Sequence, residues 1–554
     1  SILAAGGDLS LIAQEELLID GVLASGKDLS LMSTSKVTTR GATLKSSGST
    51  TLVAQEVNLG TTQLITETQA NAHRSTQLAI SENLIIEAGT VNFDATQGSI
   101  GQDAAIHASQ TLNFNAVSTY SNVGNTSNNG YLTSLINDTV DLSVGGNASL
   151  SSNGTVTLQG SQLAAGDTLT LSASHINLEA VADTHTTFTS SHSGKTYTRT
   201  SSLNTRHSGV DLKATDILLD ANNAITAKAA KLSAEEDLRL YSGNDIDIGA
   251  VNDLTQTSYE KKNKKSFGRS SSVTQRESLS INVGSELSAE NILINTARGA
   301  DESLLLHSNQ GDLNIVGSQL TASNELLAYA GEDLTLDAGQ EEYRYHYEKK
   351  KSGFAGLSGK ASVNGTQRAS TLGTQLNAGG DVVLISDTDT NVLASHVSAD
   401  ENIDLIAGQG GQGDINILSK QDYESSYAQE MKYGFSLGGL VGNGNLFESN
   451  LLETAETNST NVFSDLIAGG RLTLDASGDL KVIGSHLTGT EGIELFATGN
   501  IDLLAGMDEE ALSRYSREIA ISFGIGKLFS NPTDVISFED RALRLKLDTT
   551  TYDE

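Results

Sequence analysis

A short motif of alternating polar and apolar residues returns through this chain every twenty or twenty-one residues. Asp8-Leu9-Ser10-Leu11 comes back as Asp28-Leu29-Ser30-Leu31, and Asp312-Leu313-Asn314-Ile315 as Asp333-Leu334-Thr335-Leu336. Strict alternation is typical of a β-strand with one face turned inward, not of a helix. The constant return length excludes an antiparallel sandwich and indicates strands stacked in parallel. We therefore predict an all-β right-handed parallel β-helix, a solenoid with an aliphatic column at its centre.

Proline is almost absent, because Pro532 is the single proline among 554 residues. Ordinary domains contain roughly 5% proline. A fold that excludes proline needs nearly every backbone N–H in a hydrogen-bonded ladder. Disordered chains tolerate proline, so disorder is disfavoured. There is also no cysteine, which excludes a disulfide framework.

The formal net charge of the chain is −33. Binding to phosphate backbones needs a basic field, so we predict no nucleic-acid partner for this segment. An anionic membrane surface is also disfavoured, unless local basic patches override the total charge. The sequence contains no run of about 18 apolar residues, which a membrane-spanning helix would need.

A fifteen-residue block repeats on a longer scale. Asp312–Leu326 (DLNIVGSQLTASNEL) returns as Asp389–Ile403 and Asp479–Ile493, with an earlier copy at Thr155–Leu169 and a weaker one from Ala224. The copies start 69 to 90 residues apart. We interpret each module as about four coils, and the whole chain as roughly sixteen to eighteen coils spaced by about 4.8 Å.

The aliphatic pattern divides the chain into three parts. Residues 1–144 are predicted to be β-helix coils with irregular insertions, and residues 145–530 a β-helix of regular modules. Residues 531–554 are predicted to be the truncated start of a further repeat, so that the chain is expected to be a piece of a longer protein.

Each module contains an insertion rich in tyrosine, lysine and serine, near 183–210, 252–280, 340–375, 420–464 and 507–530. Four insertions place a tyrosine seven or eight residues before a phenylalanine that adjoins a glycine. These pairs are Tyr259 and Phe267, Tyr347 and Phe354, Tyr427 and Phe435, and Tyr515 and Phe523. Loops of this length without structure are uncommon, so we predict long β-hairpins that protrude from the stack.

Two insertions carry basic runs beside their aromatic residues. The lysines are Lys261, Lys262, Lys264 and Lys265 in one run, and Lys349, Lys350 and Lys351 in the other. Basic groups with aromatic rings suit a lipid headgroup or an acidic glycan surface, so these lysines and the four tyrosine–phenylalanine pairs are our candidate surface or membrane contacts. The alternative is a solvated hairpin whose tyrosine and phenylalanine pair across its strands. Both interpretations stay open.

We predict no catalytic residue, no metal site and no cofactor. His396 and His486 stand where other copies of the block have Gln162 and Gln319, which favours an outward polar position over a metal ligand. The run Asp387-Thr388-Asp389-Thr390-Asn391 lacks the glycine and glutamate of a calcium loop, so we predict a solvated turn. The aspartates before leucine (Asp8, Asp28, Asp312, Asp333, Asp479) are predicted to be polar turn residues.

The coil sequences AGGDLSL and AGGRLTL, with insertions such as YEKKNKKSFG, resemble haemagglutinin repeats of the second repeat region of two-partner-secretion exoproteins. Filamentous haemagglutinin adhesins and contact-dependent growth inhibition effectors carry this region. The resemblance implies a secreted protein of the Gram-negative cell surface, exported by a partner outer-membrane β-barrel transporter.

The resemblance also implies a stalk that serves adhesion or the delivery of an attached toxin to neighbouring cells. Its partner there would be a receptor, a glycan or the outer membrane of the target cell. The alternatives are a passive spacer, or a glycan-degrading enzyme with two or three carboxylates on adjacent coils. The outward positions are mostly serine, threonine, asparagine and alanine, so we predict that the chain is not an enzyme.

Overall fold

The computed structural model describes residues 1–65, 71–125, 129–296, 311–436, 445–523 and 536–553. These residues form β-strands and two short 3-10 turns, η1 (Ser266–Gly268) and η2 (Phe354–Gly356). No helix among them has the length and apolarity to cross a membrane. The all-β prediction is therefore confirmed.

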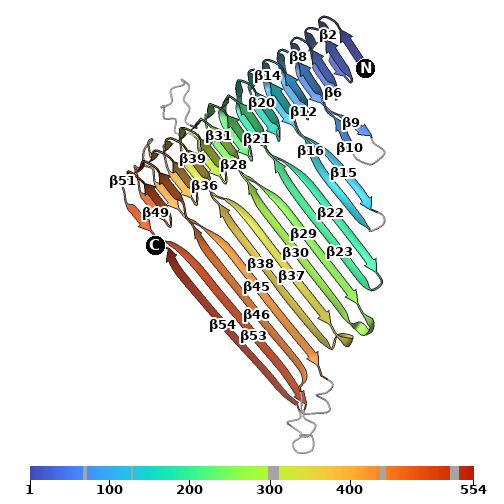
Figure 1. The fold of residues 1–554 in the computed structure, drawn as a ribbon, viewed down its shortest axis with the longest axis vertical. Coiled ribbons are helices and arrows are strands. Elements are labelled where there is room, and N and C mark those ends of the chain that lie inside the picture. The colour runs from blue at the N-terminus through green and yellow to red at the C-terminus, as the bar shows by residue number, and fades with distance from the viewer. Residues whose placement is uncertain (66–70, 126–128, 297–310, 437–444, 524–535, 554) are drawn as a thin grey trace, which may run out of the picture.

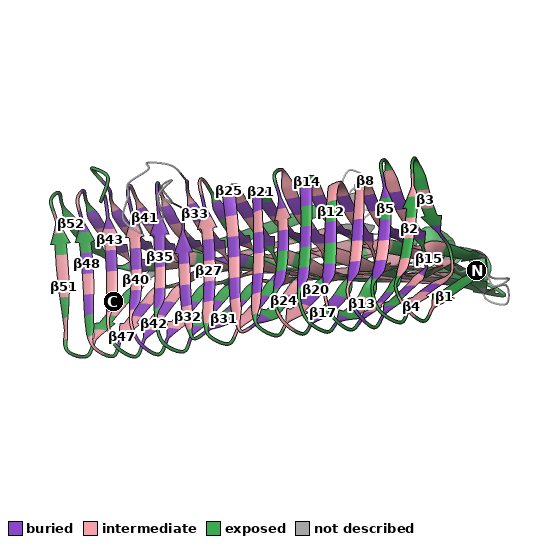
Figure 2. Ribbon diagram, turned by 90° about the horizontal axis from the view of Figure 1, so that it is seen from above, coloured by how far each residue is buried: buried purple, intermediate pink, exposed green. Residues whose placement is uncertain are grey.

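Apart from the hairpins described below, the strands before residue 505 wind into a parallel β-helix with three faces (Figures 1 and 2). The first face is a 15-stranded parallel sheet. Its strands are β1 (Ile2–Ala5), β4 (Val22–Ser25), β7 (Thr43–Ser46), β11 (Gln77–Ile80), β13 (Gln97–Ile100), β17 (Asp141–Val144), β20 (Gln162–Ala165), β24 (Asp211–Ala214), β26 (Lys231–Ala234), β31 (Glu286–Ala289), β34 (Gln319–Ala322), β39 (Gln375–Ala378), β42 (His396–Ala399), β47 (Asp465–Ala468) and β50 (His486–Gly489).

The second and third faces are also parallel, and five long strands turn the corner between them and belong to both. The shared strands are β8 (Thr50–Gly60), β12 (Leu84–Asp94), β14 (Ala104–Asn115), β21 (Thr168–Glu179) and β25 (Asp216–Lys228). The second face adds β2 (Leu9–Ala13), β5 (Leu29–Ser33), β18 (Ala148–Ser152), β27 (Asp237–Ser242), β32 (Asn291–Asn295), β35 (Leu326–Ala330), β40 (Val382–Ser386), β43 (Ile403–Ala407), β48 (Arg471–Ala476) and β51 (Gly492–Ala497). The third adds β3 (Glu16–Ile19), β6 (Lys36–Arg40), β19 (Thr155–Gln159), β28 (Ile246–Gly249), β33 (Leu313–Val316), β36 (Leu334–Asp337), β41 (Thr390–Leu393), β44 (Ile415–Leu418), β49 (Leu480–Ile483) and β52 (Ile501–Leu504).

The core is a set of aliphatic columns, as the alternation predicts. Along the first face each inward residue lies directly on its equivalent in the next coil. One such column contains Leu142, Leu163, Leu212, Leu232, Leu287, Leu320, Leu376, Val397 and Leu466, all buried. Burying a leucine contributes about 2 kcal/mol, so this column is a main source of stability. The parallel β-helix prediction is confirmed.

From β6 onward, the corner between the third and the first face alternates between two designs. In every second coil the chain passes directly from the third-face strand to the next first-face strand, and one residue at the corner adopts the left-handed backbone conformation. These residues have φ between 45° and 59°, and they are Gly41, Ala95, Gly160, Ala229, Gly317, Ala394 and Gly484. In the coils between them the chain leaves the stack at this corner and makes a hairpin.

The repeating unit is therefore two coils and one hairpin, and not the four coils that we predicted from the spacing of the fifteen-residue blocks. The insertion accounts for the remaining length of each module. The described residues contain fifteen first-face strands, so the predicted number of coils was also too high.

Six long hairpins leave the stack, and they pair with one another into a 12-stranded antiparallel sheet, called here the hairpin sheet (Figure 1). They are β15 (Val117–Asn125) with β16 (Gly130–Asp138), β22 (Val181–Ser193) with β23 (Thr196–Ser208), β29 (Val251–Lys264) with β30 (Ser270–Val283), β37 (Gly339–Ser352) with β38 (Ser358–Leu372), β45 (Lys420–Phe435) with β46 (Asn445–Val462), and β53 (Gly506–Phe523) with β54 (Ile536–Asp553). A short hairpin, β9 (Thr62–Ile65) with β10 (Asn71–Arg74), stays separate. The prediction of protruding hairpins is confirmed, but the sequence did not predict their joining.

The hairpins can join because their spacing along the coil stack equals the width of two strands in a sheet. Parallel coils stack about 4.8 Å apart, so hairpins that leave every second coil are about 9.6 Å apart along the rod. Each hairpin supplies two strands, and two strands of a sheet also occupy about 9.6 Å. Neighbouring hairpins therefore meet in hydrogen-bonding register without bending, as β23 with β29 and β38 with β45 do.

The last strand differs from the prediction for residues 531–554. Instead of starting a further coil, β54 runs back along β53 from Phe523↔Ile536 to Gly506↔Asp553. Its alternating sequence, from Arg541 to Asp548, suits a coil strand and a hairpin strand equally. Alternation alone does not distinguish the two, because both have a period of two residues.

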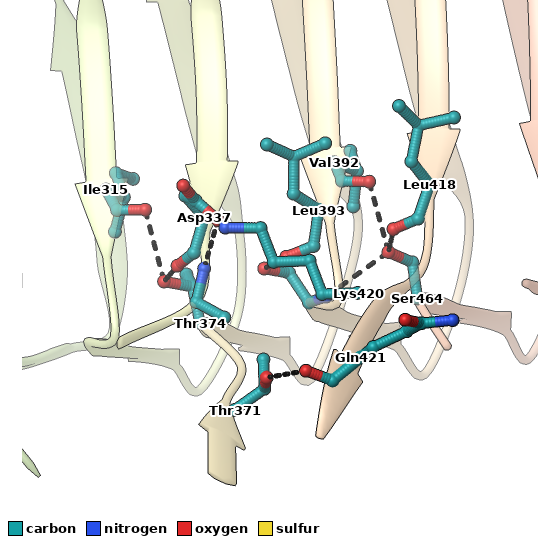
Figure 3. A network of polar contacts seen from close by, with 12 residues as sticks. Ile315, Asp337, Thr371, Thr374, Val392, Leu393, Leu418, Lys420, Gln421 and Ser464 are labelled. Carbon is teal, nitrogen blue, oxygen red and sulfur yellow. Dashed lines mark hydrogen bonds and ion pairs between the residues drawn. The ribbon is translucent and has the colours of Figure 1, made fainter. Parts of the chain in front are cut away.

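Buried hydroxyl groups anchor the hairpins where they return to the stack (Figure 3). Thr374 donates to the carbonyl oxygens of Ile315 at 3.1 Å and Asp337 at 2.6 Å. Ser464 makes the same pair of bonds, to Val392 at 3.0 Å and Leu418 at 2.9 Å. Each hydroxyl thus links the ends of two successive third-face strands at the corner where the regular ladder is interrupted.

Aspartates link neighbouring hairpins near their bases, beyond the last backbone pair that joins them. Each accepts the backbone N–H of the preceding hairpin at 2.6 to 2.8 Å. The pairs are Asp183 with Asn137, Asp253 with His207, Asp422 with Thr371, and Asp508 with Asn461. The carboxylate takes the place of a backbone carbonyl where the strands diverge toward their separate coils.

Candidate binding surface on the hairpin sheet

Strand alternation sorts the second basic run onto two faces. Along β37 the residues Tyr343, Tyr345, Tyr347, Lys349 and Lys351 share one face of the hairpin sheet, because they lie two positions apart. We call this the lysine face. The residues between them, which include Arg344, His346 and Lys350, lie on the opposite face, which we call the arginine face.

The neighbouring hairpin continues the lysine face in register. Through β30, Tyr259 is in the same cross-strand row as Tyr347, with Gln275 between them. Lys261 is in the same row as Lys349, with Val273 between them. Two predicted tyrosine–lysine pairs from insertions 88 residues apart are thus brought onto one surface.

Sequence reasoning missed two members of this surface. Lys351 lies directly opposite Lys360 of β38, which lies directly opposite Lys432 of β45. Like charges directly opposite each other destabilise a sheet. The only carboxylate within ion-pair range of these lysines among the described residues is that of Glu430, at 3.9 Å from both Lys360 and Lys432. Lys360 and Lys432 are isolated lysines in the sequence, so only the register of the hairpin strands reveals that they join Lys351.

The two faces differ in how their lysines are neutralised. On the arginine face, Lys262 and Lys350 each contact the glutamate two positions earlier in their own strand, Glu260 and Glu348, at 2.5 Å. The hydrogen bond from Lys262 to Glu260 raises the pKa of this lysine. Within the described residues, no carboxylate lies within ion-pair distance of Lys261, Lys349 or Lys351 on the lysine face.

The hairpin tips display aromatic side chains. Phe267 and Phe354 are 76% and 51% exposed, and their rings lie 5.8 Å apart on adjacent hairpins. Lys264 and Lys265 directly precede the turn that contains Phe267. Phe267 itself adopts φ 61°, a conformation that costs energy for an aromatic residue. The tip turn therefore holds an exposed ring in place.

The other predicted aromatic residues are distributed differently. Tyr427 and Tyr515 each lie one register position away from the Tyr347 row and point to the arginine face. Tyr515 there lies 5.7 Å from the guanidinium of Arg544. Phe435, near its hairpin tip, packs against Phe447 on the opposite strand, with the ring centroids 4.9 Å apart. This pair fits the alternative interpretation of a solvated hairpin whose aromatic residues pair across its strands. The side chain of Phe523 lies outside the described residues.

The recurrent aspartates cap the coils, in agreement with their prediction as turn residues. Each carboxylate accepts the backbone N–H of its equivalent one coil further on, as Asp312 does from Asp333 at 3.1 Å and Asp479 does from Asn500 at 2.7 Å. Burial raises the pKa of Asp312, and the charge of Asp333 adds to this effect. Stacked carboxylates do occupy adjacent coils here, but they are engaged in holding the coils together.

The solvated turn predicted at Asp387 is wrong for that residue. Asp387 is 1% exposed and accepts a hydrogen bond of 2.5 Å from the buried Tyr329 hydroxyl. Burial, together with this bond, raises the pKa of Tyr329. The cause is the position of Asp387 directly after a second-face strand, where the corner folds inward over the core.

His396 and His486 lie on the outer side of first-face strands, as predicted. His396 is 3.5 Å from the carboxylate of Asp465, and His486 packs against Phe463 at 4.1 Å. In the part of the chain that the structure describes, no group of three or more histidine or acidic side chains is placed to hold a metal ion.

Comparison with known proteins agrees with this architecture. The model of the Hemagglutinin repeat family matches residues 133–214, 189–354, 355–451 and 446–531, which together are more than half of the chain. The chain belongs to the Hemagglutinin repeat family. The first two matches each contain a complete long hairpin, and the other two contain long strands of the hairpin sheet, so the family signature includes hairpin strands and not only the coils.

Curated relatives are long exoproteins. The chain is 27% identical to "Toxin CdiA" of Escherichia coli over 40% of this chain and 8% of that protein. It is 23% identical to "Hemolysin" of Proteus mirabilis, over 62% and 22%, and 24% identical to "tRNA nuclease CdiA-2" of Burkholderia pseudomallei, over 54% and 10%. The chain thus spans less than a quarter of the length of these relatives. No solved structure matches it.

The expected resemblance is therefore confirmed. The chain is a haemagglutinin-repeat segment of a two-partner-secretion exoprotein. Such proteins are secreted and exposed at the cell surface of Gram-negative bacteria, and this localisation holds for the present chain.

Proposed function

We propose that this segment is an extracellular stalk whose hairpin sheet contacts the surface of a neighbouring cell, for adhesion or for delivery of an attached toxin. The observation that carries the proposal is the lysine face, where tyrosines and lysines without carboxylate partners gather on a chain of net charge −33. The names of the relatives, which include toxins and a hemolysin, support a role in delivery. Export would use a partner outer-membrane β-barrel transporter, as the family implies.

The chemistry of the lysine face suits an anionic lipid surface. A lysine near such a surface contributes about 1 kcal/mol of attraction. Tyrosine rings lie at the boundary between headgroups and acyl chains, because they have an apolar body and a polar end. The acidic coil stack would be repelled by the same surface. Contact would therefore be confined to the hairpin sheet, with Phe267 and Phe354 at its tips.

Vesicle binding tests this proposal. We expect the chain to co-sediment with vesicles of phosphatidylcholine and phosphatidylglycerol, but weakly with pure phosphatidylcholine. Replacing Lys349 and Lys351 by glutamine (K349Q/K351Q) should weaken binding roughly thirtyfold, because about 2 kcal/mol of attraction is lost.

The control is K262Q/K350Q, which removes the same charge from the same sheet but from paired lysines of the arginine face, on two neighbouring hairpins. We expect this variant to weaken binding less than about threefold. Equal loss in both variants would contradict the proposal, because it would indicate a response to total charge. Absence of binding to both kinds of vesicle would favour a passive spacer.

The enzyme alternative is tested separately, by incubating the chain with acidic polysaccharides and following new reducing ends. Formation of new reducing ends would favour a glycan-degrading enzyme, and the stalk itself would then be catalytically active.

A further inference from the structure

The arginine face contains a hollow of about 600 Å³ on the middle of the hairpin sheet, from β22 to β45. Seven strands contribute to its lining, so the hollow is about 29 Å wide at 4.8 Å per strand. It lies on the side of the sheet opposite to the lysine face, and Tyr427 is the one predicted contact residue that lines it.

Two guanidinium groups and an imidazole converge in this hollow. Arg276 of β30 lies directly opposite His346 of β37, and Arg344 lies two positions from His346 on the same face. Arg344 contacts Glu342 at 2.8 Å. Arg276 has no ion pair or hydrogen bond among the described residues, since its diagonal neighbours Glu260 and Glu348 are held by Lys262 and Lys350.

Serine, threonine and glutamine side chains, such as Ser258, Ser278, Gln256 and Gln367, form much of the floor of the hollow. Their hydroxyl and amide groups offer both donors and acceptors. The lining strands are paired on both sides, so they offer no free backbone edge to an extended peptide. Sugar hydroxyls are themselves donors and acceptors, and they match such a floor.

A tyrosine ring lies flat at one side of the hollow. A Cβ atom at Gly365 would lie only 2.5 Å from Cε1 of Tyr427, so the ring rests on the backbone of the neighbouring strand. The Tyr427 hydroxyl is 2.7 Å from Nδ1 of His346, which fixes the ring. Tyr427 is nevertheless 42% exposed, so its outer face is free to stack on an apolar ring face of a ligand.

We propose that this hollow binds an acidic oligosaccharide. Arg276 and Arg344 would hold carboxylate groups of the sugar, because guanidinium groups match planar oxyanions in bidentate geometry. The polar floor would bind the hydroxyl groups, and Tyr427 would stack on one pyranose ring. The site is independent of lipid contact by the lysine face, so either proposal can fail without the other.

Isothermal titration with a hexamer of α-1,4-linked galacturonate tests the site, with the methyl-esterified hexamer as the uncharged probe. We expect the acid form to bind and the ester to bind at least about tenfold more weakly, since each lost charged hydrogen bond weakens binding by this order. R276Q/R344Q should weaken binding of the acid form by about tenfold or more.

The matched control is K349Q/K351Q, which removes two charges from the other face of the same sheet and should change the affinity less than about twofold. Tyr427→Phe keeps the ring and should retain binding, whereas Tyr427→Ser should lose it. Circular dichroism checks that each variant keeps its strands. No binding of the acid form at about 10 mM, equal binding of the ester, or equal loss in K349Q/K351Q would overturn the proposal.

Discussion

The coil stack and the hairpin sheet are both built from hydrogen-bonded strands, but only the stack has a core. Leu240, Leu320 and Leu376 are fully buried between faces of the stack. In the twelve strands of the hairpin sheet, the only buried residues among those described are three glycines, Gly339, Gly365 and Gly506. One region is thus stabilised by apolar columns, whereas the other has two solvated faces.

This difference indicates how the sheet persists. A solvated β-hairpin is only marginally stable by itself. Here each hairpin begins and ends in the rigid stack, and the pitch of two coils places it in register with its neighbours. The stack therefore supplies the order that a core would otherwise supply, and both faces of the sheet remain available for polar and basic side chains.

The strongest way to break this relationship is to change the pitch. A second copy of Asp312–Glu332, inserted after Glu332, adds one coil between the β29–β30 and β37–β38 hairpins. Their separation would grow from about 9.6 to about 14.4 Å, beyond the reach of a backbone hydrogen bond. We expect hydrogen exchange of the amides that join β30 to β37, from Ser270 to Ser280, to lose protection while the stack stays protected.

A copy of Asp8–Lys27 inserted after Lys27 is the control for this insertion, because every described hairpin follows that coil and the added coil separates no two of them. It should leave the protection of β30 unchanged. If β30 stays protected in the first insertion as well, the matching of the two pitches is not what joins the hairpins.

A leucine truncation in each region should sharpen the contrast. Leu240→Ala removes a fully buried side chain from the stack and should destabilise it by about 3 kcal/mol. Leu279→Ala, on the half-buried surface of β30, should cost less than about 1 kcal/mol. The shift of the urea midpoint measures both, and equal shifts would indicate that the hairpin sheet has a core of its own.

The smallest effect is expected at the base of the sheet. Asp422→Ala removes the acceptor of the Thr371 N–H, a bond of 2.6 Å, and should cost about 1 kcal/mol locally. Asp422→Asn keeps a carbonyl oxygen at this place and should preserve the bond. Hydrogen exchange at Thr371 reports the difference, and identical exchange in both variants would show that the aspartate does not join the hairpins.

The candidate surface was only partly accessible to sequence reasoning. The basic runs at Lys261 and Lys349 and the tyrosines beside them could be found, since composition stands out against an acidic chain. The division of these residues between the two faces of the sheet could not be predicted, because it depends on strand register. Tyr427 illustrates this: a shift of one position relative to Tyr347 transfers it to the opposite face.

The sequence by itself determined the coil stack, because its information is local and repeated. An apolar residue at every second position, as in Leu313 and Ile315, returning after one constant length, leaves one way to bury all of them. Only the tertiary structure decided the hairpin sheet, the partners of Lys351 and the hollow around Arg276. Those contacts join segments from different modules, and they depend on the pitch of the stack, which no single hairpin sequence encodes.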